Sequence, residues 1–201
     1  MFSSQATRYH KKGFTLIELL VTISIVGILA SIGIPSFNGT IRSSRLTTNV
    51  NTLVTSLNLA RSEAIKRGQP VSVRRIDTNW ESGWTVFTDL DGNGIKEDNG
   101  ALDDDEDIRV YQAMSNSYTL RSSGISSVTY QSSGISDTGS FVLCDNSDGN
   151  NIPEANTSRL VLINSVGRVR MGRDADNNGI PEKDVSGTLT DIASCTVSPF
   201  T

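Results

Sequence analysis

Three arginines in the C-terminal third of the chain have the spacing and chemistry needed to hold phosphate groups. They lie in the segment SVGRVRMGRD and are Arg168, Arg170 and Arg173. Alternate side chains of an extended strand point to the same face about 6.5–7 Å apart, close to the phosphate spacing along one nucleic-acid strand. The planar guanidinium group suits phosphate oxygens. The segment therefore predicts a phosphate-binding strand. The alternative is a polar strand face or arginines paired with carboxylates, and the neighbouring Asp174 and Asp176 would weaken a phosphate site.

Two acidic segments carry oxygen ligands at alternate positions followed by a glycine, as at the start of a calcium-binding loop. In DLDGNGIKED the ligands are Asp89, Asp91 and Asn93, and in DADNNGIPEKD they are Asp174, Asp176 and Asn178. Neither segment has a glutamate at the twelfth position, where Gly100 and Val185 stand, and no helical pattern flanks either one. Neither segment is therefore an EF-hand; hydrated acidic turns are the favoured interpretation, and a calcium site in either loop is the alternative. The similar runs at 150–154 and 178–182 are interpreted as loop chemistry rather than as a repeat.

The remaining reactive side chains do not form a catalytic pattern. Cys144 and Cys195 are the only cysteines, and in an oxidising compartment they predict one disulfide, with two buried free thiols as the alternative. His10 is the only histidine. No nucleophile–base pair, zinc spacing or phosphate-cradling glycine loop is present, so we expect no enzyme and no cofactor besides calcium. Trp80 and Trp84 are expected to pack in the core.

The N-terminal segment contains an apolar run with one carboxylate inside it. The run extends from Phe14 to Ile34, long enough to cross a bilayer, and Glu18 lies near its start. A bare carboxylate costs roughly 2.5–3.5 kcal/mol at the centre of a membrane helix and less near an end. The preceding basic residues keep the N-terminus cytoplasmic and place the rest of the chain across the membrane; they are Arg8, Lys11 and Lys12. A single-pass anchor with an uncleaved tail is the simplest interpretation.

This segment also resembles the class III signal of type IV pilins and type II secretion pseudopilins, through the basic leader, GFTLIE and Pro35. The resemblance implies that a prepilin peptidase cleaves between Gly13 and Phe14 and that Phe14 is then methylated. It also implies that Glu18 pairs with the N-terminal amine of a neighbouring subunit during assembly, at a helix N-terminus that favours a carboxylate. The alternative is a carboxylate that reaches the membrane interface. Cleavage would remove His10 and three basic charges, which changes the net charge from −4 to −7.

The elements that must position these residues are one long helix and a set of strands. Pro35 should kink the helix without ending it, because an apolar stripe continues to Ala64. Gly68 followed by Pro70 predicts the end of the helix. Alternating patterns then predict strands at 71–76, 84–90, 108–114, 118–122, 127–131, 140–145, 159–164, 167–172 and 193–197. The expected fold class is α+β, a long N-terminal helix packed on antiparallel sheet. The expected organisation is a leader at 1–13, a transmembrane and assembly helix at 14–35, an amphipathic helix at 36–68 and a β-rich domain at 69–201.

Three further segments resemble the GspH/FimT family of minor pilins and pseudopilins: LNLARSEAIKRGQPVSV (57–73), WESGWTVFTDLDGNG (80–94), and FVLCD (141–145) followed by RLVLINSVGRVRMG (159–172). The acidic insertions after Asp91 and Arg173 depart from a minimal member. The resemblance implies a type IV pilin-like fold, an inner-membrane protein with a periplasmic C-terminal domain, and a place with other minor and major pilins in the tip or priming complex of a pilus. From FimT-type members it implies that Gly-Arg-x-Arg contacts double-stranded DNA in natural transformation. A minor pseudopilin of type II secretion is the alternative.

Overall fold

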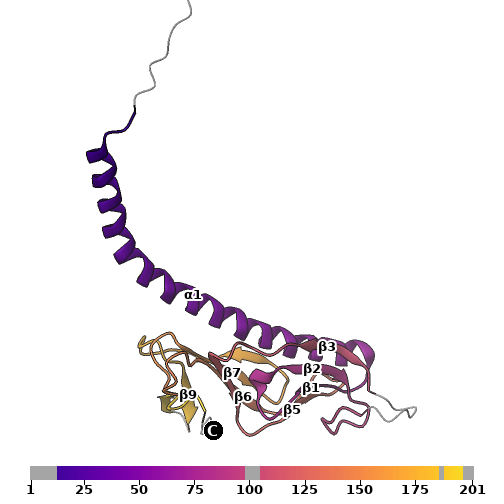
Figure 1. The fold of residues 1–201 in the computed structure, drawn as a ribbon. Coiled ribbons are helices and arrows are strands. Elements are labelled where there is room, and N and C mark those ends of the chain that lie inside the picture. The colour runs from indigo at the N-terminus through magenta and orange to yellow at the C-terminus, as the bar shows by residue number, and fades with distance from the viewer. Residues whose placement is uncertain (1–12, 98–104, 186–187, 197–201) are drawn as a thin grey trace, which may run out of the picture. The chain divides into compact units, whose positions relative to one another are not determined.

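The computed structural model (Figure 1) describes residues 13–97, 105–185 and 188–196, with the side chains of 32–36, 38 and 185 excepted. The chain divides into two compact units, Met1–Ile41 and Arg42–Thr201, called here the N-terminal unit and the globular unit. Residues 1–12 of the predicted leader, His10 among them, and Gly100 lie outside the described residues.

One long helix, α1, extends from Leu16 to Arg67. Its backbone stays helical past position 35, as the continuing apolar pattern predicts. In the N-terminal unit, the large apolar side chains from Phe14 to Leu29 are all exposed, with Phe14 at 85%. Among the residues that the structure describes, no helical segment combines the length and hydropathy needed to cross a membrane.

Within the globular unit, α1 buries the predicted apolar stripe. The buried side chains recur at helical spacing and are Leu46, Val50, Leu53, Leu57, Ala60 and Ala64. The helix ends where the sequence predicts, because Gly68 adopts the left-handed conformation (φ 69°) that glycine accepts without strain. Its N–H donates a hydrogen bond to the Ala64 carbonyl at 3.0 Å.

In the described part of the chain after the helix, the strands form two antiparallel four-stranded sheets and a hairpin. The first sheet has the order β3-β2-β1-β5, with β1 Val71–Arg75, β2 Trp84–Thr88, β3 Asp107–Tyr111 and β5 Ser127–Tyr130. The second has the order β4-β6-β7-β8, with β4 Tyr118–Ser122, β6 Gly139–Asp145, β7 Ser158–Ile163 and β8 Val169–Met171. The hairpin pairs β9 Glu182–Val185 with β10 Thr188–Asp191, and a short 3-10 helix, η1, covers Trp80–Ser82. The α+β class is therefore confirmed.

Both tryptophans pack in the main core, as expected. Trp84 stacks on Tyr111 with ring centroids 5.3 Å apart, and its Nε1 donates to Ser56 Oγ at 2.9 Å. Trp80 meets the Phe141 ring edge-on at 4.8 Å. Side chains of α1 and of both sheets contribute to this single core, so the helix and the sheets form one folded body in the globular unit.

The prediction of a last strand at 193–197 is wrong over 193–196, and the β9–β10 hairpin was not foreseen; residue 197 lies outside the described range. The hairpin segments EKDV and TLTD lack an alternation of apolar and polar residues, and β10 is exposed along its whole length. Within 193–196, Cys195 is instead buried by a disulfide, and together with the neighbouring Ile192 it belongs to a second small core.

Candidate functional site

The arginine segment lies on the outer strand of the second sheet. Among the described strands, β8 pairs only with β7, and Arg170 lies opposite Leu162. Burial alternates along the segment, because Val169 packs against the main core while Arg168 and Arg170 are exposed. Arg173 is exposed two residues beyond the strand. Two of the predicted phosphate ligands therefore stand on the solvent side of an edge strand, with the third close in sequence.

The turn that leads into β8 requires a glycine at position 167. Gly167 is buried with φ 74°, and a Cβ there would collide with the carbonyl oxygen of Gly134. Gly172 closes the other end of the segment, where a Cβ would lie 2.6 Å from the Leu160 Cβ. The glycines of the motif therefore serve close packing, and the arginines between them are left free to face solvent.

Arg61 of α1 anchors this turn. Its Nε donates to the Gly134 carbonyl at 3.0 Å, and its Nη2 donates to the Val166 carbonyl at 3.1 Å. No site role was predicted for Arg61, which lies beside the apolar stripe of the helix. Its position beside the buried Ala60 and Ala64 could have indicated that Arg61 lies at the border between the helix and the sheets.

The structure does not support the alternative that the three arginines of the segment pair with carboxylates. Among the described residues, Arg168, Arg170 and Arg173 form no ion pair with a carboxylate. Other arginines are less available. The Arg159 side chain donates to the carbonyl of the preceding residue, Ser158, at 2.7 Å, and burial lowers the pKa of Arg159. Arg74 donates to the Gly94 carbonyl at 2.6 Å.

The acidic loop after β2 begins with a buried carboxylate. Asp89 is 0% exposed, and its Oδ2 accepts hydrogen bonds from the Ser72 hydroxyl and from the Gly94 N–H. Burial raises the pKa of Asp89, and the carboxyl groups of Asp91 and Asp105 raise it further. Asp91 and Asn93 are exposed, so the loop combines one buried and several hydrated oxygen ligands.

The acidic loop after β8 gathers three carboxylates. Asp174, Asp176 and Glu182 each offer one oxygen, and these oxygens lie within 4.8 Å of one another. Glu182 is 7% exposed and accepts hydrogen bonds from the N–H groups of Ala175 and Asp176. Glu182 was not among the ligands predicted from the sequence. The predicted set ended at Asn178, because an EF-hand has its glutamate at position twelve, whereas Glu182 is at position nine of this loop.

Glu18 takes part in the cap at the start of α1. Its backbone N–H donates to Thr15 Oγ1, and its carboxylate accepts from the Thr15 N–H, each at 3.3 Å. This reciprocal pair is a capping box, in which a Thr and a Glu three residues later satisfy free N–H groups of the first turn. Gly13 and Phe14, the residues of the predicted cleavage site, are exposed beside it.

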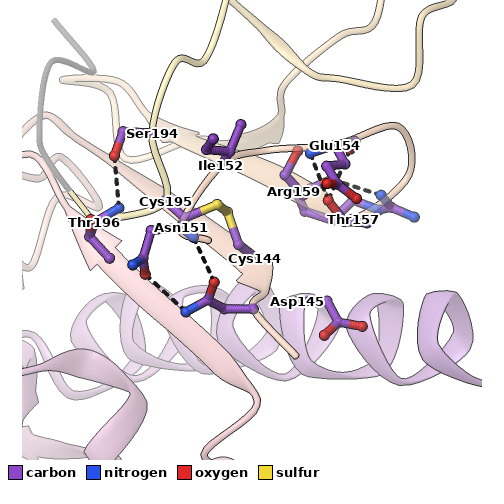
Figure 2. Close-up of a disulfide and its surroundings, with 12 residues drawn as sticks. Cys144, Asp145, Asn151, Ile152, Glu154, Thr157, Arg159, Ser194, Cys195 and Thr196 are labelled. Atoms are coloured by element: carbon purple, nitrogen blue, oxygen red, sulfur yellow. Dashed lines mark hydrogen bonds between the residues drawn. A yellow bond between two sulfur atoms is a disulfide. The ribbon is translucent and has the colours of Figure 1, made fainter. Parts of the chain in front are cut away.

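Figure 2 shows the Cys144–Cys195 disulfide, which joins β6 to the segment after β10 across a sequence separation of 51. Both cysteines are buried. The Cys195 N–H also donates to the Asn151 carbonyl at 3.0 Å, so this segment is tied to the β6–β7 loop as well. The disulfide thus holds the second small core together.

A long N-terminal helix whose second half packs on antiparallel sheets is the arrangement of type IV pilin-like proteins. The structure is similar to the crystal structure of the type IV minor pilin FimU of Pseudomonas aeruginosa, with a TM-score of 0.51 and 18% sequence identity over 76% of this chain and 96% of FimU. This likeness establishes the fold.

The chain belongs to the GspH family, whose model, described as type II transport protein GspH, matches residues 49–167. The prokaryotic N-terminal methylation motif matches residues 8–34. The chain is 40% identical over 86 residues to a fimbrial protein of Pseudomonas aeruginosa (42% of this chain, 55% of the relative). It is 48% identical over 44 residues to prepilin peptidase-dependent protein D of Escherichia coli (22% of this chain, 30% of the relative). The chain therefore spans about half the length of the fimbrial relative and less of the second one.

Proposed function

We propose that this protein is a minor pilin that enters the tip or priming complex of a type IV pilus, in a structural rather than a catalytic role. In this proposal the peptide bond between Gly13 and Phe14 is cleaved by a prepilin peptidase and Phe14 is methylated. The mature helix is held in the inner membrane until assembly, and the globular unit lies in the periplasm. Membership of the GspH family and the methylation motif support it.

The observation that carries the proposal is the exposed apolar surface of the N-terminal unit. Large apolar side chains stay exposed from Phe14 to Leu29, and none of the described side chains of the N-terminal unit belongs to a buried core. Such a surface is stable only when lipid or neighbouring helices cover it. In a filament, the helices of other pilins would provide that cover.

Glu18 then has two separable roles. Its capping box satisfies N–H groups of its own helix, and its charge would attract the N-terminal ammonium of a neighbouring subunit. A glutamine can take the same place in a capping box, but it has no charge. Glu18→Gln therefore keeps the helix start and removes the attraction.

A complementation experiment tests the assembly role. Deletion of the gene should abolish surface pili, the wild-type gene should restore them, and Glu18→Gln should restore them to less than a tenth. Mass spectrometry should show that the leader is cleaved in this variant as in the wild type. Intact pili with loss of protein secretion would instead identify a type II pseudopilin, and full piliation by the deletion strain would overturn the proposal.

We further propose that the globular unit binds double-stranded DNA through Arg168, Arg170 and Arg173. The observation in favour is that the three guanidinium groups are exposed on or beside an edge strand and form no ion pair with a described carboxylate. Three phosphate contacts give a salt slope of at most about −2.7, since each contributes about −0.9. Binding should therefore weaken by up to about 40-fold between 50 and 200 mM salt.

The test is a DNA titration of the globular unit at those two salt concentrations. Arg168→Gln/Arg170→Gln should weaken binding at least 10-fold at the lower salt and flatten the salt dependence. Arg45→Gln/Arg109→Gln is the matched control, because it removes the same charge from two exposed arginines on other elements. Equal weakening by both variants, or no binding by the wild type at 50 mM salt, would contradict a DNA site on β8.

A further inference from the structure

Three loops of the globular unit repeat one nine-residue pattern that was not interpreted as a repeat from the sequence. Loop A is 89–97, loop B is 146–154 and loop C is 174–182. They follow β2, β6 and β8 respectively. Each has an Asp or Asn first, an Asp third, an Asn fifth, a Gly or Asn sixth, an Ile seventh and a Glu ninth.

The three loops also have the same backbone conformation. In each loop the fifth-position N–H donates to the third-position carboxylate, at 3.1, 3.2 and 3.0 Å for loops A, B and C. The sixth-position N–H donates to the first side chain, at 3.0, 2.9 and 2.9 Å. The sixth residue has a positive φ in every loop, at 71°, 59° and 87°. The chain therefore turns around the side-chain oxygen of the first position three times.

Loops A and C differ from loop B at one oxygen atom of the first-position side chain. Among the described residues, only two carboxylate oxygens are buried without a hydrogen-bond partner, and they are Asp89 Oδ1 and Asp174 Oδ1. These are equivalent atoms, since the other oxygen of each carboxylate accepts the sixth-position N–H. In loop B the first residue is Asn146, whose amide donates to Asn151 Oδ1 at 2.9 Å and so has a partner.

A buried carboxylate oxygen without a partner costs free energy that a ligand would recover. The hydrogen bonds inside the loops do not explain why this oxygen has no partner, because the same hydrogen bonds are present in loop B. Its occurrence at the same atom of two separate loops points to a common ligand. The neighbouring groups are anionic, so the ligand must be a cation.

The surrounding oxygens suit a hard divalent cation. In loop C, oxygens of Asp174, Asp176 and Glu182 lie within 4.8 Å of one another, as ligands around one ion would. In loop A, the carboxylate of Asp105 is held beside the loop by the N–H groups of Leu90 and Glu97, at 3.3 and 3.0 Å. Ca²⁺ accepts six to eight oxygens in flexible geometry from positions 1, 3, 5, 7 and 9 of such a loop, with a glycine at 6, whereas Mg²⁺ requires a strict octahedron.

We propose that loops A and C each bind one Ca²⁺ ion, and that loop B is the same loop without a calcium site. The first and third carboxylates are the principal ligands, and Glu182 in loop C and Asp105 in loop A replace the glutamate that an EF-hand has at position twelve. With few carboxylates per loop, the dissociation constants should lie at about 10⁻⁴–10⁻³ M, as in extracellular calcium modules.

The third positions of the loops give a matched set of variants. Asp91, Asp148 and Asp176 occupy the same place in loops A, B and C, and all three are exposed, so Asp→Asn at each should leave the fold intact. Native mass spectrometry of the globular unit, titrated with Ca²⁺ to about 5 mM, counts the bound ions; this range brackets the affinity of such modules. The globular unit is suitable because it contains both cores and the disulfide.

The wild type should bind two ions, Asp91→Asn and Asp176→Asn one each, and Asp148→Asn two. The thermal midpoint should rise with Ca²⁺ in the wild type by mass action, and by less in Asp91→Asn and Asp176→Asn. No bound ion in the wild type, or loss of an ion in Asp148→Asn alone, would overturn the proposal. Equal binding of Mg²⁺ would overturn the choice of calcium.

Discussion

Gly167 illustrates how a single residue fixes the place of the arginine strand. Its positive φ and the nearby Gly134 carbonyl exclude any side chain. Because it immediately precedes Arg168, a change at Gly167 would move the proposed DNA contact as well as destabilise the fold. Two separate costs, backbone strain and steric collision, are expected at this one position.

We predict that Gly167→Ala lowers the free energy of unfolding by about 3 kcal/mol, because alanine is strained at positive φ and its Cβ meets a backbone carbonyl. Gly149→Ala is the matched control, since Gly149 has φ 73° and nothing within 4 Å of the Cβ position. It should cost only the strain, about 1–2 kcal/mol. Urea denaturation of both variants measures the difference, and equal costs would mean that the collision is relieved without penalty.

At the scale of elements, the contact between α1 and the first sheet contains a buried hydrogen bond. Ser56 Oγ donates to the Leu53 carbonyl at 2.7 Å and accepts the Trp84 Nε1–H at 2.9 Å, with both side chains buried. A buried indole N–H without an acceptor costs about 1–3 kcal/mol. This bond therefore adds one specific polar contact between α1 and β2 to the apolar packing of the helix.

Ser56→Ala is expected to destabilise the globular unit by about 1–3 kcal/mol through the orphaned Trp84 N–H. Ser62→Ala is the control, because Ser62 is exposed on the same helix and its hydroxyl donates to the Leu59 carbonyl at 2.8 Å. Alanine has a higher helix propensity at both sites, so Ser62→Ala should be neutral or slightly stabilising. Thermal unfolding followed by circular dichroism compares them, and a loss no larger for Ser56→Ala would argue against the bond.

At the scale of the whole molecule, polar function is concentrated in the connections between strands. The acidic loops A, B and C and the arginine segment all lie at strand ends or on an edge strand, while α1 and the inner strands supply the cores. The disulfide fixes the C-terminal segment to β6 and closes a loop of 51 residues in sequence separation. In the chain-entropy model such a closure stabilises the folded state by about 4 kcal/mol.

Local patterns were sufficient for the elements whose burial is regular. The apolar stripe of α1 and its end at Gly68 depend on contacts within a few residues. The strand patterns located β1 to β8, although β2 and the middle of β6 are buried at every position rather than on one face. The β9–β10 hairpin could not be predicted in this way. Its strands are mostly exposed, and nothing in their composition distinguishes them from a loop.

The sequence by itself determined the residue types of each candidate site: the three arginines, the two cysteines, the N-terminal motif around Glu18 and the oxygen ligands of loops A and C. Only the tertiary structure decided their surroundings. It brought Arg61 to the turn before β8, placed Glu182 beside Asp174, and left one oxygen of Asp89 and of Asp174 buried without a partner. The physical reason is that ligand chemistry belongs to the side chain, whereas burial and partners depend on segments far apart in the sequence that only the folded chain brings together.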